Sequence, residues 1–247
     1  MTFDGKTAVV TGAAGGMGAA VSRDLLAAGA SVTAIDCKPP AGGPAPAGLR
    51  RARVDLTDDE AVARVMAETF EADGRLDYLV NAAGVLWFER DRSALDIDLA
   101  VWDDVIAIDL KSMVHTARHA VPFMRKTGGG AMVHVSSTQC LRGDDRPQDA
   151  YQAAKAGVIA LSKSLAIQLA PHGIRSNTLV PGPTESPMQA RWEEDPGARA
   201  AVARTVPLGR VGRAQDMSNA ILFLLSDKAS FITGTELRVD GGLLARP

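Results

Sequence analysis

Short apolar runs alternate with segments of helical pattern along the whole chain of 247 residues. Several of the apolar runs are hydrophobic throughout, as expected for strands that are covered by helices on both faces. Strands that alternate with helices pair in parallel through right-handed crossovers. The sequence therefore predicts one α/β domain over residues 1–247, with a doubly wound parallel sheet of about seven strands and helices on both faces.

The element boundaries follow from the apolar runs and the turn residues between them. The expected strands lie near Thr7–Thr11, Ser31–Ile35, Arg53–Asp55, Leu76–Asn81, Ala131–Ser136, Ile174–Leu179 and Glu236–Val239. The expected helices lie near Met17–Ala28, Asp58–Ala72, Leu99–Arg125, Tyr151–Leu169 and Ala214–Leu225. Lys38–Gly48 is dense in Pro and Gly, so we expect an irregular surface crossover there.

Composition argues against several classes of function. A formal net charge of −2 with no basic cluster argues against nucleic-acid binding. The longest apolar run, Ala220–Leu225, is far too short to span a membrane, and no targeting segment is expected. Cys37 and Cys140 have no second Cys or His nearby at metal-ligand spacing. We therefore expect a cytoplasmic protein that binds a small molecule and no metal.

A glycine-rich turn, Thr11–Gly18, follows the first expected strand and opens the first expected helix. Backbone N–H groups at such a helix N-terminus, together with the helix dipole, attract the pyrophosphate of a dinucleotide. Gly12, Gly16 and Gly18 keep side chains out of the space where the cofactor and the helix approach closely. The strand–turn–helix context favours a Rossmann-like, dinucleotide-binding fold.

Asp36 closes the second expected strand, about twenty residues after the glycine turn. A carboxylate at this place accepts hydrogen bonds from the ribose 2′-hydroxyl and repels a 2′-phosphate. The turn offers only Ala13 and Ala14 where a basic residue would bind that phosphate. Lys38 is the one basic residue nearby, and its neighbour Pro39 suggests that it points away. The sequence therefore favours NAD over NADP.

Tyr151 and Lys155 are four residues apart on an expected helix. Residues at this spacing lie on one helix face, one turn apart. An ammonium beside the phenol favours the tyrosinate and lowers the phenol pKa from its ordinary value of about 10. The pair can therefore act as a proton-transfer device, although the same spacing also occurs on solvated helix faces.

Five motifs occur in the order and at the intervals of one known family. They are Thr11–Gly18, Asn81–Gly84, Ser136 with Ser137, Tyr151 with Lys155, and Pro181 with Gly182. In these motifs, and over nearly its whole length, the chain resembles the short-chain dehydrogenase/reductase family, in its single-domain branch of roughly 250 residues.

The resemblance implies a set of residues around the cofactor. They are Gly12, Gly16, Met17, Gly18, Asp36, Asp55, Leu56, Asn81, Ala82, Ala83, Gly84, Tyr151, Lys155, Pro181, Gly182 and Thr184. Asp55 and Leu56 would lie at the adenine ring, and Thr184 at the nicotinamide carboxamide. Asp55 can equally belong to a cluster that caps the next helix, where Asp58 is the expected N-cap.

The resemblance also implies the chemistry. Tyr151 would exchange a proton with the substrate oxygen, Lys155 would stabilise the phenolate and bind the nicotinamide ribose, and Ser137 would hold the substrate oxygen. The usual spacing places the serine thirteen residues before the tyrosine, a position that Thr138 occupies here. The Ser-Ser pair favours Ser137, with Thr138 as the alternative.

Asp109 stands where the family usually has an asparagine that supports a proton relay to the lysine. A carboxylate can accept the same hydrogen bonds. As an anion, however, it would raise the pKa of Lys155 and partly cancel the effect of that lysine on Tyr151. We keep Asp109 as a candidate relay residue.

Residues 184–208 are expected to cover the substrate, with Trp87 and Phe88 as an apolar wall. Arg142 and Arg191 would either clamp an anionic substrate group or form surface ion pairs. Family behaviour also implies a homodimer or homotetramer built on the catalytic helix.

These features predict an NAD-dependent oxidoreductase that interconverts a secondary alcohol and a ketone, with Tyr151 as the general acid and base. One alternative is an NADP-dependent carbonyl or 3-oxoacyl reductase. The other is a non-catalytic dinucleotide sensor of the same fold, because fold alone does not fix function.

Overall fold

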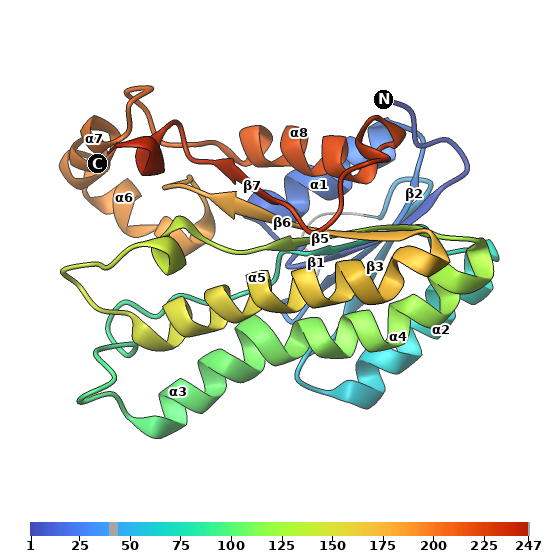
Figure 1. The fold of residues 1–247 in the computed structure, drawn as a ribbon, viewed down its shortest axis with the longest axis horizontal. Helices are drawn as coiled ribbons and strands as arrows, with labels where there is room; N and C mark the ends of the chain where they lie inside the picture. Colours follow the sequence, from blue (N-terminus) through green and yellow to red (C-terminus); the bar gives the residue numbers. More distant parts are fainter. Residues whose placement is uncertain (40–43, 247) are drawn as a thin grey trace.

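The computed structural model describes residues 1–39 and 44–246, and within them it shows one parallel sheet of seven strands. The strand order is β3-β2-β1-β4-β5-β6-β7. The strands are β1 Thr7–Thr11, β2 Ser31–Asp36, β3 Leu49–Arg53, β4 Tyr78–Asn81, β5 Gly130–Val135, β6 Ile174–Pro181 and β7 Glu236–Val239. The predicted doubly wound sheet is confirmed (Figure 1).

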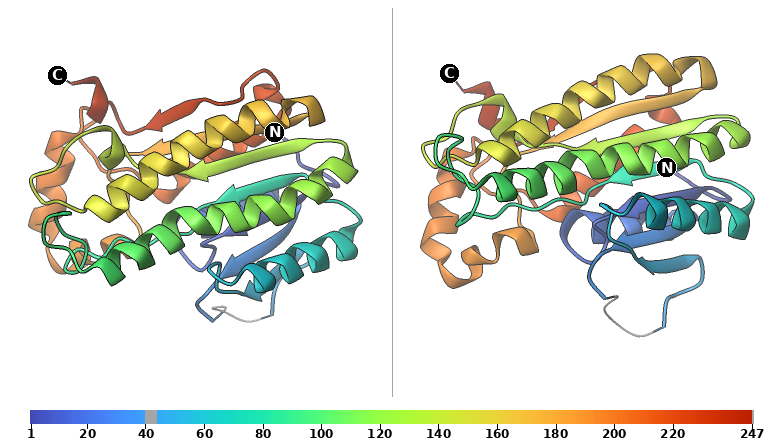
Figure 2. Two further views of the ribbon diagram at one scale, coloured as in Figure 1. Left: turned by 60° about the horizontal axis from the view of Figure 1, so that its bottom comes forward. Right: turned by 90° about the horizontal axis from the view of Figure 1, so that it is seen from below.

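Helices cover both faces of the sheet. They are α1 Gly16–Ala27, α2 Asp59–Asp73, α3 Leu99–Ile106, α4 Ser112–Thr127, α5 Asp149–Leu169, α6 Arg191–Glu194, α7 Pro196–Thr205 and α8 Ala214–Leu225. Helices α1 and α8 lie on one face of the sheet, and α2, α4 and α5 lie on the other (Figures 1 and 2). Val9 and Val10 are both fully buried but belong to the cores on opposite faces, which is why β1 is apolar throughout.

The strand order reverses beside β1. Its last residue, Thr11, pairs with Ile35 of β2 on one side and with Asn81 of β4 on the other. From this point the chain builds β2 and β3 in one direction and β4 to β7 in the other. A crevice therefore forms beyond the carboxyl ends of β1 and β4, where sheets of this kind bind their ligands.

The third strand differs from the prediction. It spans Leu49–Arg53, whereas the sequence pattern indicated Arg53–Asp55. It is the edge strand, and it pairs Leu49 with Val32 and Arg53 with Asp36. Its polar composition gave no strand pattern in the sequence, because an edge strand needs few apolar residues. Residues 40–43 of the predicted irregular crossover lie outside the described residues, and no helix or strand occupies its described remainder.

The long helix predicted over Leu99–Arg125 is interrupted. A π-helical turn, η1 Ala107–Lys111, lies between α3 and α4. π-helical turns are rare and occur mostly at functional sites. Here the turn carries Asp109, the candidate relay residue.

Helix α5, extended through the turn to His172, is long and apolar enough to cross a membrane on length and composition alone. Its inward face carries Tyr151 and Lys155, and the helix packs on β6 and β5. Its apolar character is therefore that of a core helix covered on one side by the sheet. The opposite side leaves a stripe of small residues exposed, namely Ala153, Ala156, Ala160 and Ser164.

Candidate active site

A pocket of about 980 Å³ opens at the carboxyl ends of the strands. Residues from the ends of β1, β2, β4, β5 and β6, and from the segments that follow them, line it. Every predicted site residue except Asn81 and Asp109 lies on its surface. The structure thus brings the expected cofactor and catalytic groups together at the point where the strand order reverses.

The glycine turn forms one wall of this pocket. Gly12 has a φ of +67°, and a Cβ atom there would lie 2.8 Å from the backbone nitrogen of Ala83. A Cβ atom on Gly18 would collide with the carbonyl group of Gly12. Gly15 caps α1 without a side-chain hydrogen bond, so the first N–H groups of the helix remain available to a ligand.

Asp36 lies beside this turn, at the end of β2. Its Oδ2 accepts a hydrogen bond from the Ala14 N–H at 2.9 Å, and its Oδ1 accepts one from the Lys38 N–H at 3.0 Å. A carboxylate offers about four acceptor positions, so both oxygens can still accept from ribose hydroxyls. Lys38, which we expected to point away, is among the residues that line this end of the pocket.

Asp55 and Leu56 lie at the same end of the pocket. The Asp55 carboxylate accepts hydrogen bonds from the N–H and hydroxyl groups of Thr57, at 2.9 and 2.8 Å. Asp58 is the N-cap of α2 and accepts from the Ala61 N–H at 3.0 Å, as predicted. Asp55 therefore stabilises the turn before the cap and still borders the pocket.

The Asn81 side chain points away from the pocket, into a buried polar network. Its amide group contacts His134 Nδ1 at 3.0 Å and accepts a hydrogen bond from the Thr116 hydroxyl at 2.9 Å. Burial lowers the pKa of His134 to about 3, so this imidazole is neutral. Asn81 ties β4 to β5 and α4, and its neighbours Ala82 to Gly84 form the pocket wall.

The catalytic helix begins two residues before Tyr151, and a distant carboxylate fixes its first turn. Asp91 accepts hydrogen bonds from the N–H groups of Ala150 at 3.2 Å and Tyr151 at 2.9 Å. The side chain of Gln148, the N-cap residue, makes no hydrogen bond to the N–H groups of the first helical turn. Asp91 is 1% exposed and thus replaces the missing cap from inside the protein. It positions the backbone that carries the phenol.

Tyr151 is 7% exposed and borders the pocket beside Ser137. The Ser137 hydroxyl lies near enough to the phenol to lower the pKa of Tyr151. Ser137 also caps the short 3-10 turn Thr138–Leu141, because its Oγ accepts from the Gln139 N–H at 3.2 Å. Thr138 borders the pocket as well. The contact with the phenol favours Ser137 over Thr138 as the partner of Tyr151.

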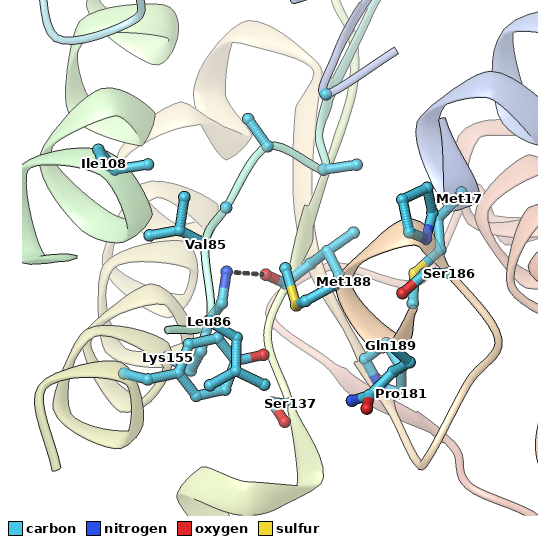
Figure 3. Close-up of a pocket in the computed structure, with 18 of the residues that line it drawn as sticks. Met17, Val85, Leu86, Ile108, Ser137, Lys155, Pro181, Ser186, Met188 and Gln189 are labelled. Atoms are coloured by element: carbon cyan, nitrogen blue, oxygen red, sulfur yellow. Dashed lines mark hydrogen bonds between the residues drawn. The ribbon is translucent and has the colours of Figure 1, made fainter. Parts of the chain in front are cut away.

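Lys155 lies one helical turn further on, with its ammonium 5.5 Å from the centre of the Tyr151 ring. It donates a hydrogen bond to the Val135 carbonyl at 3.3 Å, the dashed contact in Figure 3. Asp109 Oδ2 faces the same ammonium at 3.3 Å, and Asp109 Oδ1 accepts from the Val85 N–H at 2.7 Å. The π-helical turn thus places the Asp109 carboxylate beside the buried lysine.

These buried charges shift one another. Burial raises the pKa of Tyr151; the Lys155 ammonium and the Ser137 hydroxyl lower it, Asp109 raises it, and the net pKa lies above the ordinary value. Burial is the largest influence on Lys155 and lowers its pKa, but Asp109 and Tyr151 together outweigh burial and the net pKa is raised. Burial also raises the pKa of Asp109. Lys155 therefore lowers the pKa of Tyr151, as predicted, although burial raises this pKa by more than Lys155 lowers it.

Gly84 allows these groups to approach one another. A Cβ atom at this position would lie 3.0 Å from Lys155 Nζ and 3.2 Å from Asp109 Oδ2. On the far side, Pro181, Gly182 and Thr184 border the pocket, and the Thr184 hydroxyl donates to the Gly182 carbonyl at 2.8 Å.

The predicted covering segment, residues 184–208, folds into the 3-10 turn Pro187–Gln189 and the helices α6 and α7. Figure 3 shows Met188 and Gln189 across the pocket from Lys155 and Ser137. The segment supplies much of the outer wall, and its lining residues are Ser186, Pro187, Met188, Gln189, Arg191, Trp192 and Val202. Within the described residues, no group of three or more His, Cys, Asp or Glu side chains could hold a metal ion.

The fold and this site together define an oxidoreductase that uses a nicotinamide dinucleotide. A family model described as enoyl-(acyl carrier protein) reductase matches residues 12–244. The chain is 40% identical, over 98% of both chains, to cis-4-hydroxycyclohexanecarboxylate dehydrogenase of Sinomonas cyclohexanicum. It is 34% identical to the 3-oxoacyl-[acyl-carrier-protein] reductase FabG of Thermotoga maritima, over 99% of this chain and 100% of that relative.

Among solved structures, the ligand-free aldohexose dehydrogenase of Thermoplasma acidophilum superposes with a TM-score of 0.91 at 28% identity, covering 99% of this chain and 96% of that one. The chain belongs to the short-chain dehydrogenase/reductase family. The predicted family is therefore confirmed.

Asp91 is a functional residue that the sequence patterns do not reveal, because it lies 60 residues before the helix turn that it caps. We expect Asp91→Ala to lower the free energy of unfolding by about 1–2 kcal/mol, since two buried N–H groups lose their acceptor. Urea denaturation followed by circular dichroism measures this loss. Asp96→Ala, an exposed acid in the same loop, is the control; equal stability of the two variants would contradict the capping role.

Proposed function

We propose that the protein is an NAD-dependent dehydrogenase that interconverts a secondary alcohol and a ketone, with Tyr151 as the general acid and base. The observation that carries this proposal is the convergence of Ser137, Tyr151 and Lys155 in the pocket that the glycine turn borders. A hydroxyl, a phenol and an ammonium in this order can hold a substrate oxygen and exchange its proton.

The residues present fit a dinucleotide. The uncapped start of α1 would hold the pyrophosphate, Asp36 would hold the adenosine ribose, and the segment from Pro181 to Thr184 would border the nicotinamide. The close approach of Gly12 to Ala83 leaves this wall of the pocket free of side chains. When bound, the nicotinamide supplies the hydride acceptor or donor.

The side chains of this protein move the proton. In alcohol oxidation, the Tyr151 phenolate takes the hydroxyl proton, and Ser137 donates a hydrogen bond that holds the substrate oxygen in place. The Lys155 ammonium stabilises the phenolate, and in the reverse direction the phenol returns the proton. Preorganised donors of this kind contribute about 2.7–4 kcal/mol each to the transition state in related sites.

The charge at the adenosine end supports NAD over NADP. The Asp36 carboxylate borders the pocket beside the glycine turn, and a 2′-phosphate there would place a second negative charge against it. The 3-oxoacyl reductase activity named for the 34% identical relative is the second candidate. It uses the same proton transfer in the direction of ketone reduction.

We also propose self-association through α5. Its small residues Ala153, Ala156 and Ala160 are exposed. Small residues on a helix face allow a second helix to approach closely. A homodimer or homotetramer is the assembly that family resemblance implies.

Tyr151→Phe is the first test of the mechanism. We expect kcat to fall by at least about 10²-fold with any secondary alcohol that the protein oxidises, because the phenylalanine ring cannot accept the proton. The measurement is the absorbance of reduced cofactor, with NADH binding followed by fluorescence titration as the control. Full activity of the variant would refute the role of Tyr151. NADH binding without turnover of any alcohol or ketone would favour a sensor.

Asp36→Ala tests the cofactor preference. We expect the ratio of kcat/KM for NAD to that for NADP to fall by about tenfold or more, because the carboxylate that repels the 2′-phosphate is gone. Asp55→Asn removes a charge of the same sign from the same end of the pocket. Equal shifts in both variants would show a general charge effect in place of recognition of the ribose.

Asp109→Asn tests the buried charge. The Asp109 carboxylate raises the pKa of Tyr151, so a neutral amide should lower it. The rise of kcat with pH in alcohol oxidation should then shift toward lower pH, on the order of one pH unit. A pH–rate profile measures this shift, with Asp104→Asn, an exposed acid that borders the pocket, as the control. No shift, or a shift to higher pH, would contradict the coupling.

A further inference from the structure

Two guanidinium groups border the pocket and have no ion-pair partner among the described side chains. Arg142 comes from the loop after β5, and Arg191 is the first residue of α6. Among the described residues, neither lies within 4.0 Å of a carboxylate oxygen, whereas Arg90, Arg199 and Arg210 all do. Within the part of the chain that the structure describes, neither arginine therefore forms a surface ion pair.

Arg191 is held in place by neutral contacts. Its guanidinium carbon lies 3.7 Å from the centre of the Phe88 ring, and its Nε donates a hydrogen bond to Gln189 Oε1 at 3.1 Å. Neither of its two terminal nitrogens has a hydrogen-bond partner within the described residues. A planar guanidinium that is stacked on an aromatic ring, with its outer edge free, is well arranged to bind a carboxylate through two parallel hydrogen bonds.

Burial and a neighbouring cation act against the positive charge of Arg191. Partial burial and the nearby Arg146 lower the pKa of Arg191, and Asp144 raises it. The Asp144 carboxylate accepts the Arg146 N–H at 3.1 Å and lies beyond ion-pair distance from Arg191. Because the charged form of Arg191 is disfavoured, an incoming anion would stabilise it.

The pocket that holds these arginines and the catalytic groups is also lined by apolar side chains. They include Val85, Leu86, Trp87, Phe88, Met188 and Trp192. Figure 3 shows Val85, Leu86 and Met188 around Lys155 and Ser137. A substrate that fills this region needs a hydrocarbon body, and its polar groups would lie at Tyr151 and at the arginines.

We propose that Arg191 binds a carboxylate of the substrate, so that the preferred substrates are apolar secondary alcohols or ketones that carry a carboxylate remote from the reacting carbon. Arg142 is the second donor to the same group. This inference rests on the proposed dehydrogenase function. It assigns Arg191 to substrate specificity and gives it no part in the proton transfer.

Paired substrates test the inference. Saturated hydroxy acids of increasing length, each beside its primary amide, are oxidised by the wild-type protein with NAD. We expect the wild type to prefer the acids, and Arg191→Gln to lower the ratio of kcat/KM for acid over amide by about 10- to 100-fold, mainly through KM. Arg191→Lys should keep part of the preference, because the charge remains and the planar fork is lost.

Arg204→Gln is the matched control, since Arg204 is an exposed arginine of α7 that does not border the pocket. Its acid-to-amide ratio should equal that of the wild type. A binding measurement separates this inference from the proposed function. Hexanoate should raise the melting temperature of the wild-type complex with NADH more than hexanamide does, and the difference should disappear in Arg191→Gln.

Each remaining outcome has one meaning. If the wild type oxidises amides as well as acids, and hexanoate stabilises no more than hexanamide, Arg191 does not select an anion and only this inference fails. If Arg191→Gln raises KM for NAD equally with both kinds of substrate, Arg191 contacts the dinucleotide, which also overturns it. If hexanoate stabilises the complex but no alcohol or ketone reacts, the anion site holds and the proposed function fails.

Discussion

The buried ion pair between Lys155 and Asp109 is the interaction on which the active site depends. Both side chains are nearly inaccessible, and an unpaired charge at either position would be strongly destabilising. The pair joins α5 to the π-helical turn, and Asp109 also holds the Val85 N–H after β4. Three segments that are distant in sequence are therefore fixed around one ammonium. Gly84 is required between them because a side chain there would contact both charges.

That pairing changes the role of the lysine. An ammonium without a partner would lower the phenol pKa, but here the Asp109 carboxylate beside Lys155 raises the pKa of Tyr151 and opposes that effect. Burial of the phenol works in the same direction as the carboxylate, so the free protein keeps Tyr151 protonated at neutral pH. Ketone reduction requires the protonated phenol, whereas alcohol oxidation requires the deprotonated phenolate. If Tyr151 is the proton donor and acceptor, as proposed, the aspartate would favour the protonated phenol, and oxidation would then be favoured by higher pH.

Local patterns were enough to predict the sheet, the glycine turn and the positions of Tyr151 and Lys155, because each depends on residues close together in sequence. Four features could not be predicted in this way. β3 has the polar composition of an edge strand, and the π-helical turn arises where Asp109 meets Lys155. Asp91 caps a helix 60 residues away. That Arg191 has no ion-pair partner among the described side chains could be seen only in the three-dimensional structure.

The charged side chains differ between the two ends of the pocket. Asp36, Asp55 and Lys38 border the end beside β2, where hydroxyl groups can donate to the two carboxylates. Arg142 and Arg191 border the part next to the covering segment, where an anion is favoured. In the proposed binding mode, with the pyrophosphate at the start of α1, a dinucleotide would place its adenosine beside Asp36 and its nicotinamide toward Tyr151. The carboxylate of the proposed substrate, bound the other way round, would meet Asp36 and Asp55, so these charges would disfavour reversed binding.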